Sequence, residues 1–137
     1  MDTENKLYAL VQKGYFNSIK ETYGEDCDIE SNKFAPLIGT AIKYIDENYL
    51  SISKINEVSN HCYISESYLC RIFRRQLGIS PIDVINSRKI IHAKKLLGNG
   101  YDVTDTCFAS GFNSYCYFIA LFKKATGMTP AKYRKAL

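Results

Sequence analysis

The side chains best suited to chemistry in this sequence are arginines and lysines that follow two apolar helical patterns. Arg71, Arg74 and Arg75 belong to one pattern, and Lys123 and Lys124 belong to the other. A row of such groups can contact phosphates, and an arginine can also donate two parallel hydrogen bonds to a guanine edge. The rows therefore indicate a nucleic-acid surface, although an ordinary solvated helix face can also be basic.

These basic residues belong to an internal repeat. Five identical pairs lie 49 residues apart: Ser65 and Ser114, Tyr68 and Tyr117, Phe73 and Phe122, Gly78 and Gly127, and Pro81 and Pro130. Five further pairs at this spacing are close substitutions: Leu69 and Phe118, Ile72 and Leu121, Arg74 and Lys123, Arg75 and Lys124, and Ser80 and Thr129. Only two copies exist, so the chain holds a duplicated module and not a solenoid.

Each copy is predicted to be a helix with one buried face, because its apolar residues recur at helical spacing. The predicted buried stripes are Leu69, Ile72 and Phe73 in the first copy and Phe118, Leu121 and Phe122 in the second. At about 100° per residue, the outward positions are Ser67, Cys70, Arg71 and Arg74 in the first copy and Cys116, Ile119, Ala120 and Lys123 in the second.

A shorter apolar pattern and a turn precede each copy, at residues 55–58 and 103–107. In the turns the spacing falls to 48, since Tyr63 matches Gly111 and Ile64 matches Phe112. The second turn therefore holds one extra residue. A short helix, a turn and a longer helix with a basic outer face are typical of a helix-turn-helix.

Local start and stop signals predict the remaining helices. Pro36 begins an amphipathic helix that ends near Tyr49, and Ser53 is expected to cap a short helix. A long helix is expected over residues 81–97, spanning roughly 25 Å, and its predicted buried residues are Val84, Ile85, Ile91, Ala93 and Leu96, with Arg88 partly buried. The other expected caps and stops are Ser65, Gly78, Ser80, Asp102, Asn113 or Ser114, Gly127 and Thr129. No strand is expected, so the fold class is all-α.

Composition and charge limit the possible functions. The chain has 137 residues, of which 46% are apolar, and no apolar run approaches the length of a membrane span. Its five cysteines are odd in number and lack C-x-x-C spacing, so a reduced cytoplasm is the simpler interpretation. His61 and His92 are isolated, so we expect neither a metal site nor a cofactor.

The two ends of the chain carry opposite charge. Residues 1–35 hold four lysines and seven acids, a net charge of −3, whereas residues 36–137 have a net charge of +7. A helix is predicted over residues 1–23, followed by an acidic linker at residues 23–32. This segment is expected to be either a solvated or packed appendage or a helix that mediates dimerisation or connects domains.

Residues 36–137 resemble the DNA-binding region of AraC/XylS-type bacterial transcription regulators. The residues that carry the resemblance are Gly111-Phe112, Tyr117-Phe118, Phe122-Lys123-Lys124, Gly127, Thr129-Pro130 and Tyr133-Arg134. The resemblance implies seven helices in two subdomains, joined by a long helix. Tyr63 and Ala120 depart from the family, which usually has a glycine at the first position and often an arginine at the second.

From these features we expect an N-terminal helix and linker at residues 1–35 and a double helix-turn-helix domain at residues 36–137. Within that domain, residues 36–80 are the first module, residues 81–98 the linker helix and residues 99–137 the second module. The expected function is sequence-specific transcription regulation, as an activator, through two successive major-groove segments. The expected partners are double-stranded DNA and RNA polymerase, with no membrane and with a dimer possible through the N-terminal segment.

The expected contacts divide by chemistry. Arg71 is expected to read guanine, and the second module to anchor the DNA with a weaker preference for A/T. The base-reading residues are predicted to be Ser67, Cys70, Arg71, Cys116, Ile119 and Ala120. The phosphate-contacting residues are predicted to be Arg74, Arg75, Tyr115, Lys123 and Lys124.

Three alternatives accompany this interpretation. The chain could recruit RNA polymerase without reading bases, or oxidation of Cys70 or Cys116 could block DNA. Some family members also carry a DNA-repair region with a methyl-acceptor cysteine. That region needs a cysteine-rich zinc domain, which residues 1–35 cannot build, so we expect no enzymatic activity.

A sensor domain does not fit in those residues either, so the chain is either a naturally short regulator or part of a longer one.

Overall fold

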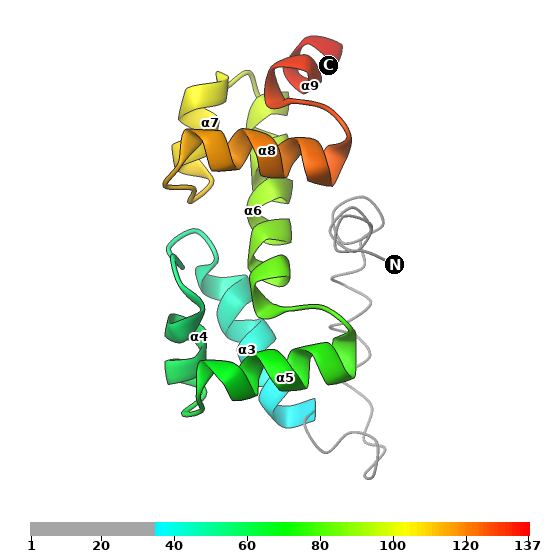
Figure 1. Ribbon diagram of the computed structural model, residues 1–137. Coiled ribbons are helices and arrows are strands. Elements are labelled where there is room, and N and C mark those ends of the chain that lie inside the picture. The colour runs from blue at the N-terminus through cyan, green and yellow to red at the C-terminus, as the bar shows by residue number, and fades with distance from the viewer. Residues whose placement is uncertain (1–34) are drawn as a thin grey trace.

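The computed structural model describes residues 35–137, and this part of the chain consists of seven helices without strands (Figure 1). The helices are α3 (Ala35–Asn48), α4 (Ile55–His61), α5 (Glu66–Leu77), α6 (Pro81–Gly98), α7 (Val103–Ala109), α8 (Tyr115–Thr126) and α9 (Pro130–Ala136). The predicted all-α class, with two helix-turn-helix units joined by a long helix, is confirmed. The helix predicted over residues 1–23 and the acidic linker lie outside the described residues.

Most helices begin at the predicted caps. The hydroxyl oxygens of Ser65 and Ser114 accept hydrogen bonds from the backbone N–H groups three residues later, at 3.1 and 3.2 Å. Ser80 and Asp83 form a reciprocal capping box at the start of α6, with both distances 3.3 Å. Asp102 and Thr129 cap α7 and α9 in the same way. These caps satisfy backbone donors that a helix start would otherwise leave unpaired.

The predicted cap of α4 is wrong by one residue. Lys54, and not Ser53, occupies the cap position, and its ammonium side chain has no acceptor to offer. The Glu57 carboxylate replaces it by accepting from the backbone N–H groups of Ser53 and Lys54, at 2.8 and 3.0 Å. An acidic side chain in the first turn can therefore perform the task that the sequence pattern assigned to serine.

Two hydrophobic cores lie on either side of the midpoint of α6. The first core joins α3, α4 and α5 to the first half of α6, and the second joins α7, α8 and α9 to its second half. The apolar stripes predicted for the repeated helices are all buried: Leu69, Ile72, Phe73, Phe118, Leu121 and Phe122. Each repeated helix therefore packs as its sequence indicated.

The buried face of α6 differs from the prediction. Ile91 and Leu96 are only partly buried, whereas Ile90 and Leu97 are fully enclosed. Polar residues Asn86, Ser87 and Lys89 are also buried, although no single apolar stripe includes them. The reason is that α6 packs against different helices along its length, so its buried face changes direction between the two cores.

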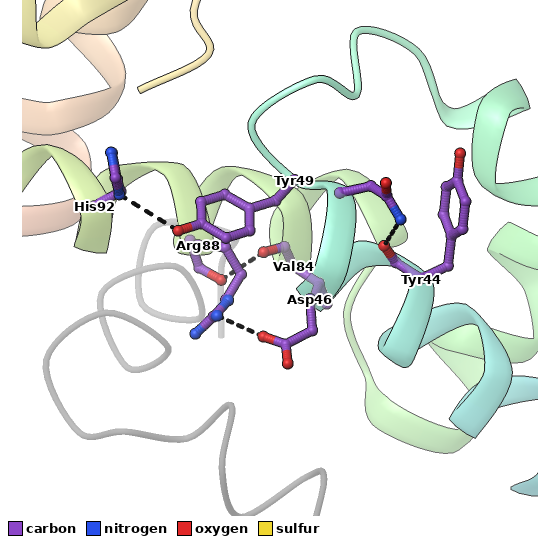
Figure 2. A network of polar contacts seen from close by, with 8 residues as sticks. Tyr44, Asp46, Tyr49, Val84, Arg88 and His92 are labelled. Atoms are coloured by element: carbon purple, nitrogen blue, oxygen red, sulfur yellow. Dashed lines mark hydrogen bonds and ion pairs between the residues drawn. The ribbon is translucent and has the colours of Figure 1, made fainter. Parts of the chain in front are cut away.

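A polar network fixes the end of α3 to α6 (Figure 2). Arg88 forms an ion pair with Asp46, and its guanidinium group lies 5.0 Å from the centre of the Tyr49 ring. The Tyr49 hydroxyl is 3.4 Å from Nδ1 of His92. Burial, and then the nearby charge of Lys95, lower the pKa of His92 below its ordinary value. The predicted partial burial of Arg88 is thus confirmed.

The two helix-turn-helix turns have the same backbone twist but different surroundings. Tyr63 and Gly111 both have positive φ, at 59° and 87°. The Tyr63 side chain is 94% exposed, whereas a Cβ atom on Gly111 would lie 2.5 Å from the Leu50 carbonyl oxygen. The first turn therefore accepts a side chain, and the second requires glycine.

This difference predicts unequal costs for two alanine substitutions. Gly127 also has positive φ, at 86°, but its missing Cβ atom faces open space. Gly127→Ala should cost about 1–2 kcal/mol from backbone strain alone. Gly111→Ala should cost about 2–5 kcal/mol, because the Leu50 backbone must also move. Urea unfolding of both variants checks this, and equal losses would contradict the close contact.

Candidate nucleic-acid interface

The two repeated helices, α5 and α8, both pack against the long helix α6. In Figure 1 both run across the long axis of α6, roughly parallel to one another and one near each end. Each contacts α6 directly. Because their apolar stripes are buried against the cores, their opposite faces are presented outward together. Two parallel helices on one rod can enter neighbouring stretches of the same groove.

The outward face of α5 is basic. Ser67, Arg71, Arg74 and Arg75 are exposed, and Cys70 is partly exposed. Arg71 and Arg74 lie three residues apart, so their side chains leave the same face of the helix. This arrangement places planar guanidinium donors where a base edge or a phosphate could meet them.

The outward face of α8 is less basic and less polar. Tyr115, Cys116, Ala120, Lys123 and Lys124 are all exposed. Ile119 differs from the prediction, because it is partly buried and packs against the second core. Its helical position lies beside the buried stripe, so the hydrophobic effect draws it inward. Ile119 is therefore only partly available at the outer face.

The helix starts differ in charge. Glu66 occupies the first turn of α5, whereas the first turn of α8 holds no acidic residue. A helix N-terminus carries a partial positive charge, which an acidic side chain offsets. The start of α8 therefore remains more favourable to an anion than the start of α5. This contrast agrees with an anchoring role for the second helix.

Tyr117 is a positioning residue that the sequence analysis did not assign. Its hydroxyl accepts a hydrogen bond from Nδ2 of the buried Asn86, at 2.9 Å, and its ring packs near Phe112. Half of its surface is exposed, at 50%. The identity of Tyr68 and Tyr117 in the repeat was the signal that could have revealed it. The bond ties the first turn of α8 to α6.

Other chemistries find little support in residues 35–137. Cys62 and Cys107 are buried, and burial raises the pKa of both thiols, so they behave as core residues. Within this described part of the chain, His, Cys, Asp and Glu side chains form no group of three that could hold a metal ion. Among the same residues, no helix is both long and apolar enough to cross a membrane.

Comparisons with known proteins agree with this geometry. Residues 58–136 match the family model of a helix-turn-helix domain. The chain is 38% identical over 134 residues to the uncharacterized HTH-type transcriptional regulator YijO of Escherichia coli, covering 96% of this chain and 47% of that protein. It is 32% identical over 94 residues to the bifunctional transcriptional activator and DNA repair enzyme AdaA of Bacillus subtilis, covering 68% and 44%.

A solved structure shares the fold. The C-terminal domain of AraT, a response regulator from Geobacillus stearothermophilus, superposes with a TM-score of 0.69 at 27% identity, covering 74% of this chain and 86% of that one. The chain spans less than half the length of the two curated relatives, YijO and AdaA. The likeness therefore concerns the helical domain described above.

The Tyr117 bond can be tested by removing one hydroxyl. Tyr117→Phe should destabilise the protein by about 1 kcal/mol, because Asn86 loses its acceptor. Tyr115→Phe removes a hydroxyl from an exposed neighbour and should change stability by less than about 0.5 kcal/mol. Urea unfolding of the two variants makes the comparison. Equal effects would show that the bond to Asn86 does not hold α8 in place.

Proposed function

The chain belongs to the AraC/XylS family of helix-turn-helix regulators, and on this basis we propose that residues 36–137 bind duplex DNA and regulate transcription. The observation that carries the proposal is the pair of outward-facing helices, α5 and α8, held parallel on one rod with basic side chains exposed on both. Residues 36–80 form the first module, residues 81–98 the linker and residues 99–137 the second module.

The dimensions support binding to two successive major-groove segments. Helix α6 has 18 residues, which span about 27 Å. One turn of DNA is about 34 Å. Since α5 and α8 lie near opposite ends of α6 and extend beyond its axis, the pair can reach two segments on the same side of the duplex. One chain should therefore bind a direct, non-palindromic pair of half-sites.

The two modules have different proposed roles. On α5, Ser67, Cys70 and Arg71 face the bases, with Arg71 supplying hydrogen bonds to guanine. On α8, Cys116, Ile119 and Ala120 cannot make a bidentate hydrogen bond, but Ile119 and Ala120 can touch thymine methyls, so this helix has only a weak A/T preference. The proposed phosphate contacts are Arg74, Arg75, Tyr115, Lys123 and Lys124. Hydrogen-bonded readout is thus concentrated in the first module.

The proposal also includes partners other than DNA. RNA polymerase is the proposed protein partner of the DNA-bound chain, which acts as an activator, and residues 1–35 are the proposed dimerisation segment. The proposed location is the cytoplasm. Although AdaA is bifunctional, the proposed role of this chain is DNA binding without enzymatic activity. The competing function is recruitment of polymerase without base reading.

Binding to DNA and its salt dependence test the proposal directly. Genomic fragments bound by the chain are sequenced, and the enriched site is footprinted. Protection should cover two segments about one DNA turn apart. About six Lys/Arg–phosphate contacts, of which the two arginines and two lysines named above are four, should give a log–log salt slope of about −5. A slope near zero would exclude nucleic-acid binding, and a site that competes no better than random duplex would favour recruitment alone.

Substitutions on the two helices test the division of roles. Arg71→Ala should cost about 1–3 kcal/mol on the enriched site and remove the preference at one base pair. Lys123→Ala should weaken specific and random duplexes equally, because phosphates carry no sequence information. Affinities for single-base variants across the site provide the measurement. The division is wrong if the largest base penalties fall under α8, or if Arg71→Ala leaves the preference profile unchanged.

A further inference from the structure

Lys89, near the middle of α6, is a buried charged residue that the DNA-binding surface does not use. Only 6% of it is exposed. Its Nζ atom donates hydrogen bonds to the carbonyl oxygens of Ile52 and Gly111, at 2.7 and 2.8 Å. A lysine is rarely buried to this degree unless its donors are satisfied, because removing an ammonium group from water is costly.

The two acceptors belong to different modules. Ile52 lies in the loop between α3 and α4, whereas Gly111 lies in the turn between α7 and α8. The ammonium group also lies 5.6 Å from the centre of the Phe112 ring, which belongs to the second core. Lys89 therefore bonds simultaneously to a backbone segment of each helix-turn-helix unit. No apolar residue at this position could do so.

The two segments that Lys89 joins also touch each other. The space where a Cβ atom of Gly111 would lie is occupied by the Leu50 backbone, with the carbonyl oxygen at 2.5 Å. The modules are therefore connected by α6 and, independently, by a contact between the loop at residues 50–52 and the turn at residues 110–112. Two connections resist rotation of one module about the linker helix far better than one.

We propose that Lys89 determines the spacing and phase of the two DNA half-sites by fixing the placement of α8 relative to α5. The proposal rests on the proposed DNA-binding function. Each inserted base pair moves the second half-site by about 3.4 Å along the helix axis and rotates it about that axis. When Lys89 holds the two modules in fixed positions, the chain binds tightly at only one half-site spacing. With Lys89 unable to bond to both carbonyls, the second module can follow a displaced half-site.

The DNA test uses the enriched site with zero, one or two base pairs inserted between its half-sites. The unmodified chain should lose at least about 10-fold in affinity for the longest insertion. Lys89→Met keeps the aliphatic chain but removes the donors, and Lys89→Gln keeps N–H donors but is too short to reach both carbonyls. For both variants the ratio of affinities between spacings should fall to within about 3-fold of unity.

A matched control distinguishes the loss of the Lys89 hydrogen bonds from the loss of one positive charge. Lys95 lies on the same helix but is exposed, so Lys95→Met removes the same charge from solvent. It should weaken all spacings alike and preserve their ratio. A purely structural role of Lys89 would lower thermal stability and leave the spacing ratio unchanged in whichever Lys89 variant folds. The ratio, and not affinity alone, is therefore the deciding quantity.

A second measurement needs no DNA. Cys70 on α5 and Cys116 on α8 are accessible thiols, one on each repeated helix. In a Cys27→Ser background, spin labels on these two residues report the distance between the modules by pulsed electron resonance. We expect one narrow distribution in the parent and in Lys95→Met, and a distribution at least about twice as broad in the Lys89 variants.

The possible outcomes distinguish the proposed role of Lys89 from the proposed DNA-binding function. The proposal is wrong if the Lys89 variants keep both the width of the Cys70–Cys116 distance distribution and the ratio of affinities between half-site spacings. Broadened distances with an unchanged ratio would also overturn the spacing role, although Lys89 would still hold the modules. If the unmodified chain prefers no duplex over random DNA, the proposed function and its spacing rule fail together, and the distance measurement alone still decides whether Lys89 fixes the modules.

Discussion

The bonds from Lys89 to one carbonyl in each module are the interaction on which the arrangement of this protein depends. Each core is small and is completed by one half of α6, so neither core alone determines where the other lies. The ammonium group is held where the two cores meet, with two of its three donors directed at backbone carbonyls. Burial lowers the pKa of Lys89, and the charge of Glu57 opposes that decrease.

Helical geometry allows α6 to hold its neighbours in several directions. Successive residues project about 100° apart, so Arg88 leaves the helix nearly opposite Asn86, whereas Asn86 and Lys89, three residues apart, share a face. Asn86 bonds to α8, Arg88 pairs with α3, and Lys89 bonds to the loop and turn between them. A helix with this many polar contacts has no uniform apolar stripe. Helix α6 therefore holds the two modules in place as well as separating them.

The sequence predicted what local chemistry determines. The apolar stripes, such as Leu69 and Phe73, and the caps at Ser65 and Ser80 depend on residues close together in the chain, and all are confirmed. Burial along α6 was only partly predicted, because it depends on helices packed from different directions. Ile119 is partly buried where an outward position was expected, because it lies beside the buried stripe of α8.

The candidate site was predictable to a similar extent. Helical periodicity identified the exposed Arg71 and Lys123 without knowledge of the tertiary structure. Periodicity could not show that Tyr117 bonds to a residue 31 positions earlier, or that a lysine bonds to carbonyls 37 and 22 residues away. Such contacts arise only when both modules are assembled on α6. The separation of α5 and α8 therefore had no signal in the sequence of either helix.

The unequal surroundings of the two turns affect how this duplicated protein can change over time. The Tyr63 side chain faces water, so it is under little steric selection, and a fluorescent label in its place would leave both cores untouched. In the other turn, Gly111 lies against the Leu50 backbone of the first module, which leaves no room for a side chain at this position. Two copies that began as equivalents are thus no longer interchangeable. The first is free to diversify, while the second is constrained by the neighbour against which it is built.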